Sequence, residues 1–138
     1  MTRSDFQQLA DVRIDEAGVL LAAGKWDGAY YLAGYAVECA LKACIAKLTR
    51  ADDFPPKRKF VDDCYSHDIN VLLRIAGLDG RRDSEAKAKP QFKAYWAEAA
   101  QWNEQTRYER RVQADAERLY KAITDPTDGV LQWIRGHW

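Results

Sequence analysis

Apolar residues recur along most of the chain every three or four positions, which is the period of an amphipathic α-helix. The first such set is Phe6, Ala10, Ile14, Ala17 and Leu21. Gly24 predicts the end of this helix, and Asp27 predicts the N-cap of a second and longest helix over residues 27–49. The apolar stripe of the second helix consists of Tyr30, Gly34, Val37, Leu41, Ile45 and Leu48.

Proline and charge interrupt this pattern after the second helix. Residues 50–66 contain two consecutive prolines and alternating acidic and basic blocks, and they predict a long loop. Ser66 is the expected N-cap of a short third helix that ends near Gly77. Residues 77–85 predict a second turn.

Helical spacing then returns and completes the predicted fold. A fourth helix is expected over residues 85–103 and a fifth over residues 108–123. Asp125 as N-cap and Pro126 at the first helical position predict a sixth helix. No β alternation is apparent. We therefore predict an all-α protein with a single domain over residues 1–138, an antiparallel up-and-down helical bundle of four main helices plus short extra helices.

Composition narrows the classes of function. The chain has 138 residues, and 21 Lys and Arg are balanced by 21 Asp and Glu, for a formal net charge of zero. This balance argues against a protein that coats DNA, which needs an excess of positive charge. No uncharged stretch approaches the length of a transmembrane helix, and the N-terminus carries charges where a signal peptide is apolar. We expect a cytoplasmic protein with no membrane association.

The cysteines indicate neither a disulfide framework nor a metal site. Cys39, Cys44 and Cys64 are odd in number and lack the paired spacing of a zinc site. Two of them stand in an apolar helical pattern, where a reduced cysteine acts as a small hydrophobe. Glycine-rich phosphate loops and His-Glu-x-x-His motifs are also absent from the sequence. We therefore expect no metal and no cofactor, and we assign no catalytic residue.

Glu38 borders the apolar stripe of the second helix, where a carboxylate is costly unless it is paired. Lys42, one turn later, is the natural partner in the favourable order of charges. Two interpretations remain open: an ion pair that stabilises the bundle, and a carboxylate that lines a ligand cleft. On the second interpretation Glu38 and Lys42 are candidates for nucleotide or phosphate binding.

Basic residues gather at the predicted start of the fifth helix. Arg107 and Arg111 would lie one turn apart there and could share a phosphate through fork-like hydrogen bonds. Cations at a helix N-terminus oppose the helix dipole, which makes a purely structural purpose less natural. Ion pairs with neighbouring acids on a solvated face are the alternative. Arg107, Tyr108 and Arg111 are therefore candidates for contact with phosphate or RNA.

His67 and Asp68 form a candidate polar site at the start of the predicted third helix. A general base needs an orienting partner and a nearby nucleophile, and the sequence places neither. Capping or a buried hydrogen bond is the alternative for His67. His137, next to the last residue, is expected to be disordered and receives no role.

Aromatic residues are numerous for a chain of this size, with five Trp and seven Tyr. The tryptophans are Trp26, Trp96, Trp102, Trp133 and Trp138. They cannot all occupy the centre of one small core, so we expect some of them to form a surface for a partner.

Four segments together resemble the HEPN family, the higher eukaryotes and prokaryotes nucleotide-binding domains. These are WDGAYYLAGYAVECALKA (residues 26–43), SHDINVLL (66–73), WNEQTRY (102–108) and GVLQWI (129–134). The signature positions are Glu38, Leu41, Lys42, Arg107 and Tyr108. The resemblance implies a helical bundle that pairs into a homodimer and is often coupled to a small nucleotidyltransferase as a toxin–antitoxin pair.

The resemblance also implies a ribonuclease site that this chain lacks. Many members of the family are metal-independent ribonucleases in which an Arg is followed, after a short polar spacer, by a His. Residues 60–62 precede His67 at that spacing and residues 130–132 precede His137, and neither set contains an arginine. The resemblance therefore gives no catalytic residues here.

The leading expectation is a HEPN-like module that binds a nucleotide, RNA or a protein, as the partner of a small nucleotidyltransferase in a toxin–antitoxin-type pair. One alternative is a metal-independent ribonuclease toxin with a divergent site, in which folding brings Arg107 or Arg110 near His67. Another is a purely structural adaptor that recognises only protein.

Overall fold

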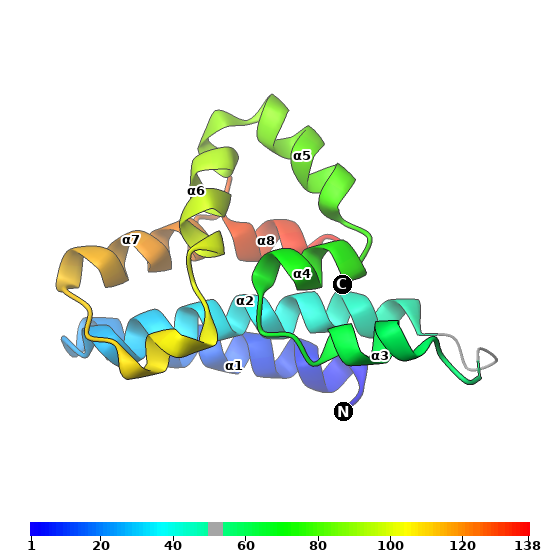
Figure 1. Ribbon diagram of the computed structural model, residues 1–138. Coiled ribbons are helices and arrows are strands. Elements are labelled where there is room, and N and C mark those ends of the chain that lie inside the picture. The colour runs from blue at the N-terminus through cyan, green and yellow to red at the C-terminus, as the bar shows by residue number, and fades with distance from the viewer. Residues whose placement is uncertain (50–53) are drawn as a thin grey trace.

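The computed structural model describes residues 1–49 and 54–138, and every regular element in these ranges is a helix (Figure 1). The elements are α1 (Arg3–Ala22), α2 (Trp26–Leu48), α3 (Arg58–Cys64), α4 (Ile69–Ile75), α5 (Asp79–Ala88), α6 (Pro90–Ala100), the 3₁₀ helix η1 (Glu104–Tyr108), α7 (Gln113–Thr124) and α8 (Val130–Arg135). The all-α prediction is confirmed for these ranges. None of the helices described is long and apolar enough to cross a lipid bilayer.

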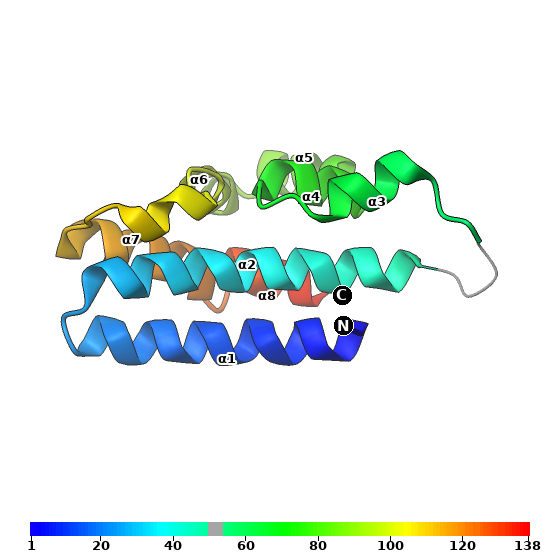
Figure 2. The same ribbon diagram turned by 60° about the horizontal axis from the view of Figure 1, so that its bottom comes forward.

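The two longest helices, α1 and α2, form an antiparallel pair that runs along the molecule (Figure 2). Gly24 joins them with a φ of 73°, a left-handed conformation that glycine adopts without steric cost. The predicted helix end at Gly24 is therefore confirmed. The predicted cap at Asp27 is wrong, because α2 begins at Trp26 with Lys25 as N-cap. The Asp27 carboxylate instead accepts a hydrogen bond from the backbone N–H of Arg111.

Helix α2 is the centre of the core and contacts α1, α4, α7, α8 and η1. Its predicted apolar stripe is buried except for Leu48, and buried residues also extend around most of its circumference. A helix of this kind is stable only when neighbours cover it. Small residues on α2, such as Ala33, Gly34 and Ala40, let those neighbours approach closely.

The predicted loop over residues 50–66 is wrong in part, because α3 forms within it. Lys59 and Asp63, one turn apart on α3, make an ion pair at 2.9 Å. Arg58 also faces Asp62, so the basic and acidic residues within α3 are partners one turn apart. Residues 50–53 of the predicted loop lie outside the described residues.

The connection from α3 to α4 is built from two short side-chain caps. Asp68 is the N-cap of α4, and its carboxylate accepts hydrogen bonds from two backbone N–H groups of the first turn. Ser66, the predicted cap, instead accepts a hydrogen bond from the N–H of Asp68. The two caps fix the backbone on both sides of His67. Gly77 ends α4 as predicted, with a φ of 70°.

The predicted turn over residues 77–85 and the predicted helix over residues 85–103 are both wrong in their bounds, because α5 and α6 form a helical hairpin there. The break falls at Pro90, whose missing N–H cannot continue α5 but suits the first position of α6. No residue of α5 is buried. The guanidinium of Arg82 holds α5 against α6 by lying over the Trp96 ring, 5.4 Å from its centroid.

The predicted fifth helix begins later than expected, because η1 and an extended segment precede α7. Arg107 is in η1 and Arg111 is in the extended segment, so their predicted placement one turn apart on a helix is wrong. The Arg111 guanidinium lies over the ring of Tyr30, 4.1 Å from its centroid, and pairs with Glu109.

The predicted start of the sixth helix is also wrong. The Asp125 carboxylate accepts hydrogen bonds from the N–H groups of Thr127 and Asp128, so Pro126 lies in a turn, and α8 begins after Gly129. A Cβ at residue 129 would lie 2.3 Å from the carbonyl oxygen of Asp125. Only glycine permits this close turn.

The three cysteines are free thiols, as predicted. Cys39 and Cys44 are buried on α2, and burial raises the pKa of each thiol to about 11. Cys64 is half-buried on α3, and burial raises its pKa as well. All three are therefore protonated at neutral pH and behave as small hydrophobes.

The tryptophans divide between the core and its edge. Trp96 and Trp102 are buried, whereas Trp26, Trp133 and Trp138 are only partly buried. The prediction that they cannot all be central is confirmed, and the surface for a partner stays a prediction.

Candidate functional site

Glu38 is buried in the middle of α2, on a helix whose other buried residues are apolar or small. Only 2% of the residue is exposed. Its Oε1 atom pairs with Nζ of Lys42 at 3.0 Å and accepts a hydrogen bond from Nδ1 of His67 at 2.9 Å. A carboxylate at this depth needs such partners, because desolvation of an unpaired charge is expensive. Glu38 is thus the centre of a polar cluster against the core.

His67 reaches Glu38 from the capped connection between α3 and α4. About half of the imidazole is exposed (46%), and its Nε2 lies 3.3 Å from Oε2 of Glu104 on η1. The ring therefore bridges a buried and a half-buried carboxylate. A charged imidazolium donates to both of these carboxylates, whereas a neutral imidazole donates to only one.

Buried polar atoms without a partner concentrate on α2 and on the segment that packs against it. Five buried side-chain atoms among the described residues have no hydrogen-bond partner, and three of them lie here: Oε2 of Glu38, Nε1 of Trp102 and Oγ1 of Thr106. The other two are Nε1 of Trp96 and Nε of Arg111. Each such group costs on the order of 1–3 kcal/mol relative to a satisfied one. A region that retains several of them is a candidate for a functional role.

Trp102 anchors η1 over α2. Its ring lies against Gly34, one turn before Glu38, and a Cβ on Gly34 would come within 2.2 Å of the ring. Tyr31 packs on the same indole with ring centroids 5.9 Å apart. Because Gly34 has no side chain, the Trp102 ring can pack directly on α2. This packing positions η1, and Glu104 with it.

A row of aromatic rings continues from this anchor to the surface. Tyr31 and Tyr35 stack with centroids 6.1 Å apart and an interplanar angle of 5°. On η1, the guanidinium of Arg107 lies 4.9 Å from the ring centroid of Tyr108, which is 74% exposed. The Tyr108 hydroxyl, and to a smaller extent Tyr31 and Glu104, raise the pKa of Arg107. An exposed cation–aromatic pair is therefore present on η1, close enough to the row for Tyr31 to act on its charge.

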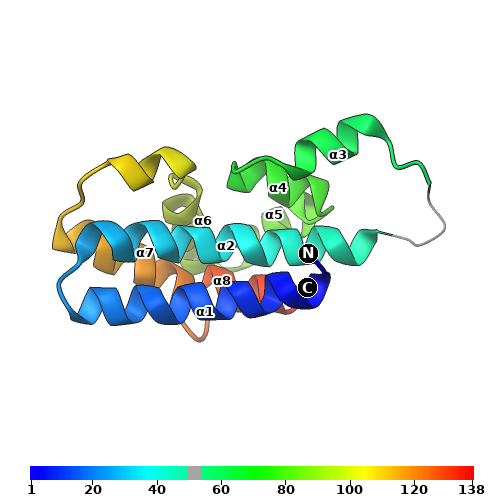
Figure 3. The same cartoon turned by 90° about the horizontal axis from the view of Figure 1, so that it is seen from below.

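We call this surface the tyrosine–carboxylate face. It consists of Tyr31, Tyr35, Glu38 and Lys42 on α2, Glu104, Arg107 and Tyr108 on η1, and His67. Figure 3 shows η1, in yellow, and α4 on the same side of α2, with α1 on the opposite side. The face combines stacked rings, two cations and a carboxylate–imidazole pair. It can therefore offer stacking surfaces, phosphate ligands and a proton-transfer group.

Most of the predicted site residues meet on this face. These are Glu38, Lys42, His67, Arg107 and Tyr108. The alternative for His67, a hydrogen bond to a buried group, is also what the structure shows. Asp68 serves as the cap of α4, and Arg111 packs on Tyr30, so neither belongs to the face.

Sequence reasoning missed three residues of the face. Tyr31 and Tyr35 carry a readable signal, because they continue on one side of the helix to Glu38 at spacings of four and three residues. Glu104 carries no such signal. Its position beside His67 depends on how Trp102 seats η1 against α2.

No group of three or more His, Cys, Asp or Glu in residues 1–49 and 54–138 is placed to hold a metal ion. In comparisons with known proteins, no family model, no curated protein and no solved structure matches this chain.

Proposed function

We propose that this protein is a HEPN-like binding module whose tyrosine–carboxylate face binds single-stranded RNA or a nucleotide. The observation that carries the proposal is the exposed Arg107–Tyr108 pair on η1, close enough to the stacked Tyr31 and Tyr35 rings for Tyr31 to act on the charge of Arg107. Unpaired bases stack on aromatic rings and on guanidinium planes, and phosphates accept hydrogen bonds from arginine and lysine. The exposed Arg107–Tyr108 pair offers both kinds of contact, and the stacked Tyr31 and Tyr35 rings are partly exposed.

The placement of the signature residues supports the HEPN resemblance as the frame of this proposal. Glu38, Lys42, Arg107 and Tyr108 come from distant parts of the sequence and lie on one face. The same proposal includes the up-and-down arrangement of four main helices, a homodimer, a small nucleotidyltransferase as toxin–antitoxin partner, and a cytoplasmic location.

Arg107→Ala and Tyr108→Ala are each expected to weaken the binding of a short unstructured RNA by about tenfold, because each removes a stacking surface or a phosphate ligand. Fluorescence anisotropy of a labelled oligonucleotide at constant salt measures the affinity, and AMP as competitor tests whether a nucleotide suffices. Added salt should weaken binding, since phosphate contacts release counterions.

The matched control is Lys121→Ala, which removes an exposed cation of α7 outside the face. It should bind RNA as the unchanged protein does. If the unchanged protein binds neither RNA nor AMP, the proposal is wrong and the protein-only adaptor is favoured. If both face variants bind normally, RNA is held elsewhere.

The His67–Glu38 contact favours a second candidate, the metal-independent ribonuclease. A buried carboxylate on Nδ1 orients an imidazole and fixes its tautomer, which is how a general base is prepared for use at Nε2. Such a base would take the proton of a ribose 2′-hydroxyl, and the 2′-oxygen would attack the adjacent phosphorus. The P–O5′ bond then breaks, and the leaving 5′-oxygen takes a proton from water to become a 5′-hydroxyl. Arg107, near Glu104 on the same side, would bind the phosphate.

Under this second candidate the protein should cleave RNA in the presence of EDTA and leave cyclic 2′,3′-phosphate ends, and His67→Ala should abolish the cleavage. General acid–base groups contribute about 10²- to 10⁴-fold, so the loss is easily measured on a gel. His137→Ala serves as the control imidazole. An unchanged protein that cleaves no RNA removes this candidate and leaves the binding proposal intact.

A further inference from the structure

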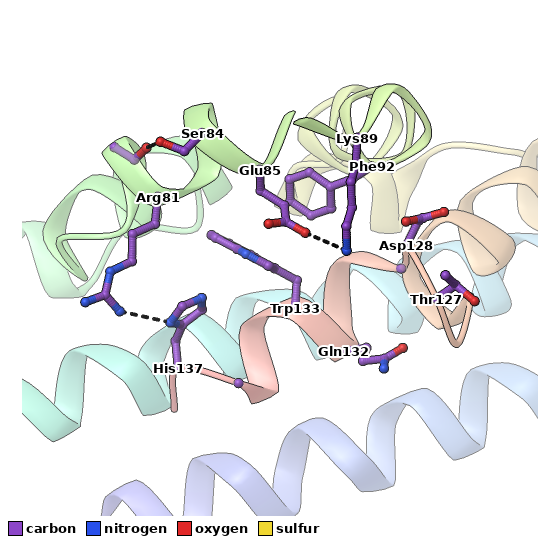
Figure 4. Close-up of a pocket in the computed structure, with 13 residues that line it drawn as sticks. Arg81, Ser84, Glu85, Lys89, Phe92, Thr127, Asp128, Gln132, Trp133 and His137 are labelled. Atoms are coloured by element: carbon purple, nitrogen blue, oxygen red, sulfur yellow. Dashed lines mark hydrogen bonds and ion pairs between the residues drawn. The ribbon is translucent and has the colours of Figure 1, made fainter. Parts of the chain in front are cut away.

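A cavity of about 630 Å³ lies between α5 and α8 and shares no residue with the tyrosine–carboxylate face. Its size is that of a small-molecule site. The α5–α6 hairpin stands out from the rest of the molecule (Figure 1), and side chains from α5 and α8 point into the space beneath it (Figure 4). One wall of the cavity is aromatic and the other is polar.

The aromatic wall is rigid. Trp133 lines the cavity and packs against Phe92, with ring centroids 5.3 Å apart, and edge-on against Trp96 at 6.0 Å. Phe92 and Trp96 are buried, whereas Trp133 is only partly buried. Part of the Trp133 ring is thus held by the core, and the remainder is available to a planar ligand.

The polar wall presents the guanidinium of Arg81 to the cavity. Glu85 pairs with Lys89 at 3.0 Å, and this contact raises the pKa of Lys89. By contrast, no carboxylate in the described ranges pairs with Arg81, and its guanidinium bonds to Nδ1 of His137 at 3.2 Å. A guanidinium has five N–H donors, so most of those on Arg81 remain for another acceptor.

His137 contributes to the cavity as a neutral ring. A guanidinium only donates, so Nδ1 of His137 accepts and the ring proton is on Nε2. Burial, and then the charges of Arg81 and Lys47, lower the pKa of His137. The ring packs edge-on against Trp133 at 4.9 Å, so the predicted disorder of His137 is wrong. The Arg81 end of the cavity therefore carries a net positive charge.

Acceptor groups lie at the other end of the cavity. Asp128 lines it from the turn before α8, and its charge acts on Lys89. In Figure 4 the Trp133 ring lies between the Arg81–His137 pair and the Glu85–Lys89 pair. A ligand that spans the cavity thus meets a cation, then an aromatic ring, then a carboxylate.

We propose that this cavity binds a small planar anion, with a carboxylate or phosphate at Arg81, an aromatic ring against Trp133 and a hydrogen-bond donor toward Asp128. The two sources of such an anion are an aromatic carboxylate and a mononucleotide. The proposal does not depend on the function proposed for the tyrosine–carboxylate face.

Isothermal titration calorimetry with p-aminobenzoate and with AMP tests the proposal and separates the two sources. At least one probe is expected to bind, and Arg81→Met should weaken that binding by about tenfold to a hundredfold, since it removes charge-assisted hydrogen bonds. Lys87→Met is the control, because Lys87 is an exposed cation of α5 that does not line the cavity. AMP binding that depends on Arg107 and not on Arg81 belongs to the other face and counts against this site.

A second variant, Gly80→Leu, tests the cavity without changing its charge. Gly80 lines the cavity, and a Cβ there would have no heavy atom within 4 Å. Gly80→Leu should therefore fold and should block the ligand by filling the space. The proposal is overturned if neither probe binds, or if both Arg81→Met and Gly80→Leu bind as the unchanged protein does.

Discussion

Glu38→Ala is expected to lower the free energy of unfolding by about 3 to 5 kcal/mol, the range found when one partner of a buried ion pair is removed. The substitution leaves the largely buried ammonium of Lys42 without its carboxylate and removes the hydrogen-bond partner of His67 Nδ1. It also leaves an unfilled space on the most buried helix of the fold. Urea unfolding followed by circular dichroism measures the change.

Two further variants separate the charge of Glu38 from its volume. Glu38→Gln keeps the volume and one acceptor, so its cost should be smaller, about 1 to 2 kcal/mol. Glu16→Ala removes the partner of Arg13 in a partly exposed pair on α1 and should cost less than about 1 kcal/mol. A Glu38→Ala protein as stable as Glu16→Ala would show that the buried cluster does not hold the fold together.

Trp102→Ala is expected to cost about 3 to 5 kcal/mol, because it removes a fully packed indole from the contact between η1 and α2. Gly34→Ala disturbs the same contact from the α2 side, by adding a Cβ where the ring packs. Its Cβ would lie 2.2 Å from the ring, and overpacking of this kind costs about 1 to 3 kcal/mol even though alanine is the better helix former.

The effect of Gly34→Ala on the free energy of unfolding should change sign when the Trp102 ring is removed. In the Trp102→Ala background the space at residue 34 is open, so Gly34→Ala should become stabilising by about 0.5 to 1 kcal/mol. Gly80→Ala is the control for helix propensity alone, since its Cβ meets no neighbour. If Gly34→Ala destabilises both backgrounds equally, the Trp102 ring is not what excludes a side chain there.

The two long helices at the centre of the core were predictable from the sequence, and the helices that bury no residue were not. The periodic apolar residues of α1 and α2, and Gly24 between them, specify local structure and burial together. α5 has no buried residue, so its sequence lacks an apolar stripe and resembles a turn. Its contacts with the molecule include Arg82 over Trp96 and Arg81 at His137, pairings that depend on the tertiary structure.

The candidate site likewise has one part that was predictable from the sequence and one part that was not. The Glu38–Lys42 pair is one helical turn apart and therefore visible in the sequence. His67 and Glu104 join it from segments whose positions depend on the α4 cap and on the seat of Trp102 at Gly34. For Arg107 and Arg111 the local spacing gave a wrong prediction. The spacing fits one helical turn, but Arg107 lies in η1 and Arg111 lies in an extended segment.

The absence of buried residues on α5 also bears on how the molecule opens. A segment that buries little apolar surface separates from the native structure at a lower free energy than the core does, so the amide protons of α5 are expected to exchange with solvent through local opening while α2 stays closed. The polar wall that carries Arg81 is therefore the adjustable side of the cavity, and the aromatic wall of Trp133 and Phe92 is its fixed side. A ligand held between them would hold α5 against α8 and slow that exchange.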